Sequence, residues 1–136
     1  MRKVAWVLGL MLLSRLASGV EIIANQSVSA NSLSLASARA IFGLRQTQWM
    51  DDTSIQVFVL ADKNATHVAL CKEKLNLFPY QLRQSWDRLV YAGMAQAPIE
   101  VSNEEELVNR VAATQGAIGY VRKVKPNDSI KILQIK

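Results

Sequence analysis

The sequence predicts a single α/β domain in three layers, with a mixed β-sheet covered by helices on both faces. Residues 55–60 (IQVFVL) read as a strand with very few polar positions, which is typical of a strand buried on both of its faces. Segments with strand and helix patterns then alternate along the chain, which is the arrangement of an α/β fold. No internal repeat or linker divides the chain, so one domain is expected.

The first residues have the features of a targeting segment. After a basic start, residues 4–13 form an apolar run too short to span a bilayer as a helix, and residues 17–19 are small. We expect residues 1–19 to be a cleaved signal peptide and residues 20–136 to be the mature domain, located in the periplasm. An uncleaved membrane anchor is the competing interpretation, but Arg15 interrupts its apolar stretch. No stable membrane insertion is expected after cleavage.

Charge and cysteine content limit the classes of partner and of stabilisation. The formal net charge is +5, and it falls to +5 − 3 = +2 when the three basic residues of the targeting segment are removed. No basic stripe remains, so nucleic acid is not an expected partner. Cys71 is the only cysteine and cannot form an intramolecular disulfide. Its register with Leu75 on a helical face predicts a buried, free thiol.

In the first half of the chain, residues 21–25 (EIIAN) predict a short buried strand. Ser34 is suited to cap a helix at residues 35–42, which Gly43 would end. After the central strand, a polar turn leads into a helix at residues 65–75.

The second half begins with a helix at residues 79–91, because Pro79 suits a first helical position. Trp86 lies on the apolar face of this helix together with Leu82, Leu89 and Val90, so it is expected in the core. 

A candidate short strand at residues 99–101 follows, and then a helix that ends near Ala113. Ser102 and Glu105 fit a capping box, and the three acids at residues 104–106 suit a helix N-terminus better than a metal site. Strands at residues 117–121 and 130–135 complete the order of elements.

The polar turn after the central strand is the main candidate site. In such turns the first helical N–H groups lack an intrahelical partner and can bind an anion. Asp62 and Asn64 would equally serve as simple helix caps, so the turn has two interpretations. His67 and Cys71 share a helical face, but they have no third ligand or orienting carboxylate beside them. We therefore expect no catalytic residues, no metal and no cofactor.

Two runs of the sequence resemble a known family. The run "ARAIFGLRQTQWMDDTSIQVFVLADKNATHVAL", at residues 38–70, and the later run "TQGAIGYV", at residues 114–121, resemble the phosphate-binding proteins that feed bacterial ABC transporters. A group of short, single-lobe relatives of those proteins is the nearer match. The resemblance covers most of residues 21–135. It implies a domain equivalent to one lobe of a periplasmic binding protein, and a non-enzymatic binding function.

The family resemblance also implies where a ligand would bind. In that family an arginine, an aspartate and a Ser-Gly-Thr run wrap the phosphate in a cleft between two lobes. Asp62 matches the aspartate and Thr66 the threonine, whereas Leu60, Asn64 and Ala65 stand in place of the arginine, serine and glycine. Leucine cannot supply the paired, charge-assisted hydrogen bonds of an arginine.

Two functions follow as expectations. The first is weak binding of phosphate or another small anion. Its candidate contacts are Asp62, Asn64, Ala65, Thr66, His67, Ser32 and Ser34. The second is a ligand-free module that binds an envelope protein or a second copy of itself, which the loss of the arginine and of the second lobe favours.

Overall fold

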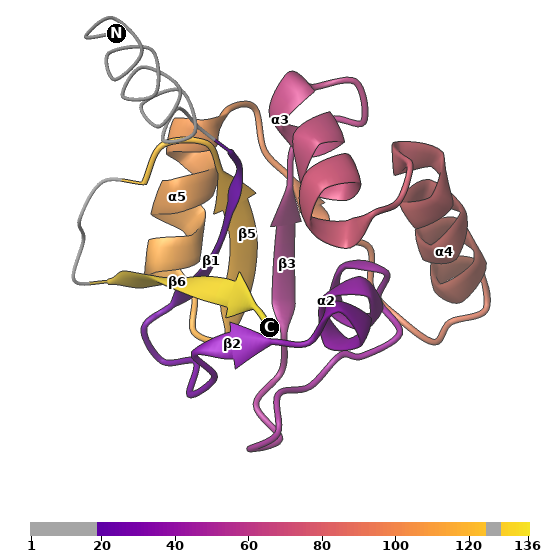
Figure 1. Cartoon of the computed structure of the whole chain (residues 1–136). Helices are drawn as coiled ribbons and strands as arrows, with labels where there is room; N and C mark the ends of the chain where they lie inside the picture. Colours follow the sequence, from indigo (N-terminus) through magenta and orange to yellow (C-terminus); the bar gives the residue numbers. More distant parts are fainter. Residues whose placement is uncertain (1–18, 125–128) are drawn as a thin grey trace, which may run out of the picture.

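The computed structural model describes residues 19–124 and 129–136, so the predicted signal peptide lies outside the described residues except for Gly19. Within the described residues, six strands form one mixed sheet in the order β2-β6-β1-β5-β3-β4 (Figure 1). β1 runs antiparallel to β5 and β6, β2 is parallel to β6, and β3 is parallel to both of its neighbours, β4 and β5. The strands are β1 (Glu21–Asn25), β2 (Ser32–Leu33), β3 (Gln56–Val59), β4 (Ile99–Glu100), β5 (Ala117–Val121) and β6 (Ile130–Ile135).

The helices connect these strands. They are α2 (Leu35–Phe42), α3 (Ala65–Ala69), the π-helix η1 (Leu70–Leu75), α4 (Pro79–Tyr91) and α5 (Glu104–Ala113). The predicted helix at residues 65–75 is confirmed in extent, but its second half is a π-helix, which the sequence did not reveal. Bonding from i to i+5 places Leu70 and Leu75 in line, and both side chains are fully buried. No described helix has both the length and the apolar character needed to cross a membrane.

Helices cover both faces of the sheet, which β5 shows most directly. A Cβ atom placed on Gly119 would lie 2.5 Å from Leu107 of α5, so this helix packs closely on one face of β5. The ring of the next residue, Tyr120, packs against Phe42 of α2 and His67 of α3, with centroids 6.0 and 5.7 Å apart. Successive strand residues point to opposite faces. The predicted three-layer α/β domain is therefore confirmed (Figure 1).

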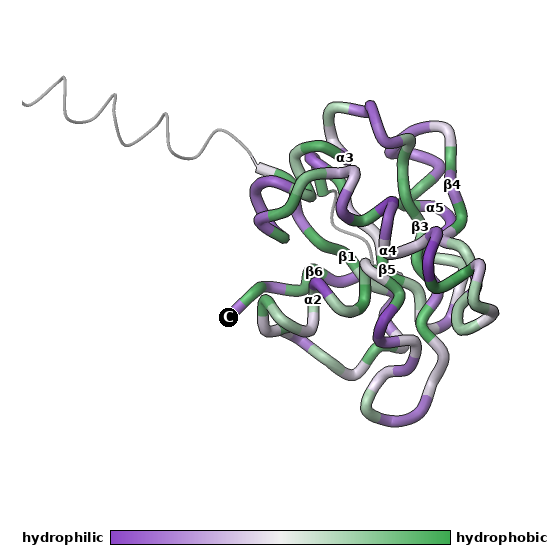
Figure 2. Tube along the Cα trace, turned by 90° about the vertical axis from the view of Figure 1, so that its right-hand side faces the viewer, coloured by the Kyte–Doolittle hydropathy of each residue, from purple (hydrophilic) through white to green (hydrophobic). Residues whose placement is uncertain are grey.

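β3 is the covered strand that the sequence predicted. It lies between β5 and β4, and Val57, Phe58 and Val59 are all buried, as is Leu60 directly after the strand. Hydrophobic and hydrophilic stretches alternate along the trace in Figure 2. The predicted core positions Trp86 and Cys71 are also buried.

Three local details differ from the sequence analysis. β2, an edge strand of only two residues, was not predicted, because its length leaves no periodic pattern to recognise. Val90, predicted on the buried face of α4, is 38% exposed since the helix buries only a narrow stripe around Leu82 and Trp86. The cap of α5 also lies one residue later than predicted. Asn103, as good a cap as serine, accepts a hydrogen bond from the backbone N–H of Glu106.

The contact of α5 with Gly119 gives the first prediction. In a Gly119→Ala variant the new methyl group would meet Leu107 at 2.5 Å and Val111 at 3.0 Å. Overpacking of this kind costs about 1–3 kcal/mol, so urea denaturation should show a loss of that size in the free energy of unfolding. The cost should be smaller in a Leu107→Ala background, because the clashing atoms are absent there. An unchanged unfolding midpoint for Gly119→Ala would contradict this packing of α5 on β5.

Candidate anion-binding site

The candidate turn lies where an open α/β sheet usually binds ligands. β3, β4 and β5 are parallel, so the segments that follow them meet at one edge of the sheet. After β3 the chain passes through α3 and α4 to β4 on one side, and it then returns through α5 to β5 on the other side. The order of strands thus reverses at β3. A crevice outside the carboxyl ends of strands at such a reversal is the expected ligand position.

Asn64 caps α3 and satisfies two of the N–H groups that an anion would otherwise bind. Its Oδ1 atom accepts hydrogen bonds from the backbone N–H groups of Thr66, at 2.8 Å, and His67, at 3.4 Å. The first of these bonds is short, and it fixes the conformation of the turn. Asn64 therefore acts as a helix cap in the structure, as one of the two interpretations expected.

The Thr66 side chain is buried and lies between two residues from other elements. Its hydroxyl donates to the carboxylate Oε2 of Glu104, at 3.0 Å. The Arg122 guanidinium donates from Nε to Thr66 Oγ1, at 3.3 Å, and from Nη2 to the carbonyl oxygen of Ala65, at 3.5 Å. Glu104 begins α5 and Arg122 directly follows β5. These contacts join the start of α3 to the carboxyl end of β5.

The sequence analysis did not single out Arg122 or place Glu104 in the site. Thr66 is 56 residues from Arg122 and 38 residues from Glu104, so no local pattern relates them. The only signal available was topological, since Arg122 directly follows a predicted strand, and ligands of α/β sheets bind at strand ends. Arg122 supplies a cation at the turn, where the sequence lacks the arginine of the resembled family at position 60.

Asp62 is directed toward α4. The Arg83 guanidinium donates to both of its carboxylate oxygens, at 2.8 and 3.0 Å. This hydrogen-bonded pair lowers the pKa of Asp62 below its ordinary value. Arg83 also lies over the Trp86 ring, 4.9 Å from the centroid. Asp62 thus links the turn to α4, and it shares no hydrogen bond with Thr66 in the described residues.

His67 is fully buried and belongs to a polar chain in the core. The backbone N–H of Leu60 donates to the Tyr120 hydroxyl at 2.8 Å, and that hydroxyl contacts Nδ1 of His67. The other ring nitrogen, Nε2, lies 3.7 Å from the Cys71 sulfur. With Tyr120 O–H donating to Nδ1, the imidazole is neutral and carries its proton on Nε2. Burial lowers the pKa of His67, which favours the same neutral form.

The same burial makes Cys71 unsuited to nucleophilic chemistry. Desolvation raises the pKa of its thiol to about 12, so the thiol stays protonated at neutral pH. In the described part of the chain, no group of three or more His, Cys, Asp or Glu side chains could hold a metal ion.

The two serine candidates lie apart from the turn. Ser32 is on β2, the edge strand, and β6, β1 and β5 separate it from β3. Ser34 caps α2, where its Oγ accepts a hydrogen bond from the backbone N–H of Ser37 at 3.0 Å. Among the described residues, no hydrogen bond connects either serine with the turn at residues 62–67.

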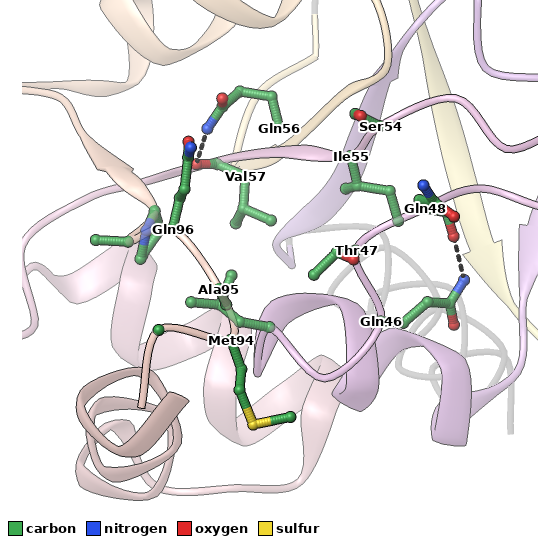
Figure 3. A pocket seen from close by; sticks show the side chains of 14 residues that line it. Gln46, Thr47, Gln48, Ser54, Ile55, Gln56, Val57, Met94, Ala95 and Gln96 are labelled. Carbon is green, nitrogen blue, oxygen red and sulfur yellow. Dashed lines mark hydrogen bonds between the residues drawn. The ribbon is translucent and has the colours of Figure 1, made fainter. Parts of the chain in front are cut away.

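Two hollows on the described surface lie away from Thr66. One, of about 400 Å³, is lined by uncharged residues near the start of β3, including Gln46, Gln48, Gln56 and Gln96 (Figure 3). Another, of about 490 Å³, lies between α4 and β4 and carries Arg83, Asp87 and Glu100. The first offers no cation and the second has more acidic than basic groups, so neither suits an anion. Neither hollow is lined by a residue of the turn at residues 62–67.

Neither a protein-family model nor a curated protein matches the sequence. Solved structures do match the fold. A candidate phosphate ABC transporter substrate-binding protein from Clostridium perfringens, solved with bound phosphate, superposes with a TM-score of 0.66 at 17% identity, over 87% of this chain and 45% of that one.

Two further solved structures also match the fold. An ABC-type phosphate transport receptor from Vibrio cholerae gives a TM-score of 0.61 at 17% identity, over 87% of this chain and 46% of that one. A phosphate-binding protein from Stenotrophomonas maltophilia gives a TM-score of 0.59 at 18% identity, over 88% of this chain and 39% of that one. The chain has the fold of one lobe of a periplasmic binding protein. It spans less than half the length of these structures. The resemblance seen in the sequence is thus confirmed at the level of the fold.

The buried imidazole predicts a specific pH dependence of stability. Because the pKa of His67 is lower in the folded protein than its ordinary value of 6.5, the unfolded chain binds the proton more readily. The free energy of unfolding should therefore fall as the pH drops from about 6.5 through the lower pKa of the folded state, by at most about 1.4 kcal/mol per pH unit.

His67 is the only histidine, so a His67→Gln variant should lose this dependence. Urea denaturation at several pH values above the carboxylate range would measure both slopes. Equal slopes for the variant and the wild type would show that the imidazole is not the titrating group.

Leu60 predicts the outcome of restoring the family arginine. Its side chain is fully buried at the end of β3, and its N–H is bonded to Tyr120. Leu60→Arg should lower the free energy of unfolding by about 3 kcal/mol or more, because it buries an unpaired charge, and it should not create phosphate binding. Leu60→Met, which preserves volume, should cost less than about 1.5 kcal/mol. A stable arginine variant that binds phosphate more tightly than the wild type would show that the side chain can leave the core.

Proposed function

We propose that this chain is an exported, non-enzymatic binding module that binds a small oxyanion such as phosphate weakly at the start of α3. The observation that carries the proposal is the position of Arg122. Its guanidinium contacts Thr66 Oγ1 and the Ala65 carbonyl oxygen, and it has no carboxylate partner within salt-bridge distance among the described residues. A guanidinium has five N–H donors, of which these contacts use two.

The remaining donors of Arg122 can serve an oxyanion at the surface. Arg122 is exposed, and guanidinium–oxyanion hydrogen bonds are charge-assisted. The N–H groups of Thr66 and His67 are already bonded to Asn64, so they add little. An open site with one main cation supports a dissociation constant roughly in the millimolar range. The bound phosphate of the Clostridium perfringens structure supports the choice of anion.

Export to the periplasm is part of the same proposal. It rests on the basic start, the apolar run and the small residues at positions 17–19, most of which lie outside the described residues. The single buried cysteine is compatible with an oxidising compartment, because it has no disulfide to form and is shielded from oxidants.

A binding module for another protein is the second candidate function. Five large apolar side chains are exposed on and beside α4, and exposed apolar surface can mark a site for another protein. They are Phe78 (54%), Tyr80 (60%), Val90 (38%), Tyr91 (94%) and Met94 (73%). This candidate predicts no response to any anion, so the titration below separates it from the first.

Substitution of Arg122 tests the anion site. Phosphate should shift the backbone amide NMR signals of Thr66 and Arg122 in the wild type, with affinity that falls as salt is added. Arg122→Ala should weaken binding about tenfold or more, because it removes a charge-assisted contact. Lys123→Ala is the matched control, since it removes the same charge from the adjacent exposed position and should change affinity little. Equal losses in both variants, or no phosphate response in the wild type, would refute the site.

A further inference from the structure

Glu104 makes contacts that helix capping does not require. The N-terminus of α5 is already capped, because Asn103 Oδ1 accepts from the Glu106 N–H at 2.8 Å and Glu106 Oε2 accepts from the Ser102 N–H at 2.9 Å. Glu105, next in the chain, is exposed. Glu104 instead reaches away from its own helix to the end of β5 and the start of α3.

The Glu104 carboxylate is bound as a small anion would be. Its Oε1 accepts a hydrogen bond of 2.6 Å from the backbone N–H of Arg122, and its Oε2 accepts one of 3.0 Å from the Thr66 hydroxyl. A backbone N–H and a hydroxyl that converge on two oxygens of one anionic group are typical of anion recognition in proteins. The group that they hold here belongs to the chain itself.

This arrangement has an electrostatic consequence for any external anion. Thr66 has one hydroxyl proton, and the structure directs it to Glu104. An oxyanion that approached Thr66 would lose this donor and would also lie beside a like charge. At separations of about 4 Å, such repulsion amounts to about 1 kcal/mol in water and more at a partly buried position.

We propose that the Glu104 carboxylate is an internal ligand that occupies the anion position at Thr66 and competes with external oxyanions for it. This inference rests on the proposed function, because it names what regulates the affinity of the same site. Arg122 and Glu104 carry opposite charges beside Thr66, so the internal ligand offsets the charge of Arg122 when it is in place. Removal of the carboxylate leaves the Arg122 guanidinium, the Arg122 N–H and the Thr66 hydroxyl together without an anion.

The test is a phosphate titration of Glu104→Gln and Glu104→Ala, followed by NMR or calorimetry. Both variants should bind phosphate about tenfold or more tightly than the wild type, and Arg122→Ala should reverse the gain. Glu104→Gln removes the negative charge and keeps an acceptor for the Arg122 N–H, so it tests the inference even if the alanine variant unfolds. Glu105→Ala is the control, since it removes the same charge from the same turn of α5, and its affinity should stay within about twofold of the wild type.

The outcomes separate the two claims. If the wild type binds phosphate through Arg122 but the Glu104 variants bind no more tightly than Glu105→Ala, the internal ligand is refuted and the proposed function stands. If neither the wild type nor the Glu104 variants respond to phosphate, the proposed function and the internal ligand both fall. Tighter binding in the Glu104 variants that persists after Arg122→Ala would also overturn the inference, because the anion would then bind elsewhere.

Discussion

The hydroxyl of Tyr120 joins the three parts of the molecule on which the candidate site depends. It accepts a hydrogen bond from the N–H of Leu60, at the end of β3, and contacts the ring of His67, in α3. Tyr120 itself is in β5 and is fully buried. Breaking either contact would leave a buried polar group without a partner, at a cost of about 1–3 kcal/mol. The turn between Leu60 and His67 is thereby held at both ends by one side chain from the neighbouring strand.

A turn fixed in this way has little capacity left for a ligand of its own. Asn64 accepts from the first helical N–H groups, Asp62 is paired with Arg83, and His67 is directed into the core. The polar side chains that contact Thr66 come from the ends of other elements, Glu104 and Arg122, and Lys63 is the exposed charged side chain of the turn itself. The residues that stabilise the turn are therefore different from the residues that could bind an anion there.

The sequence was sufficient to predict those features that depend on local pattern. The buried strand at residues 55–60, the helix start near Ala65 and the burial of Trp86 each follow from the spacing of apolar residues and from capping. The resemblance to phosphate-binding proteins added the single-lobe fold. Local patterns do not predict contacts between segments that are distant in the sequence. The association of Thr66 with Arg122 arises only because β3 and β5 are adjacent, although α4, β4 and α5 separate them along the chain. 

Two residues together are the physical basis for proposing weak and not strong anion binding. Leu60 fills the core where the resembled family has a cation, and it cannot be exchanged for arginine without burying a charge. Two guanidinium groups contact the turn: Arg83 is paired with Asp62, and Arg122 contacts Thr66, where the Glu104 carboxylate also accepts from the hydroxyl. At Thr66 itself the negative charge of Glu104 offsets the positive charge of Arg122, which weakens the attraction for an anion there. The donors at Thr66 and Arg122 have a hydrogen-bonding geometry suited to an oxyanion, but they are bonded to a carboxylate of the chain itself.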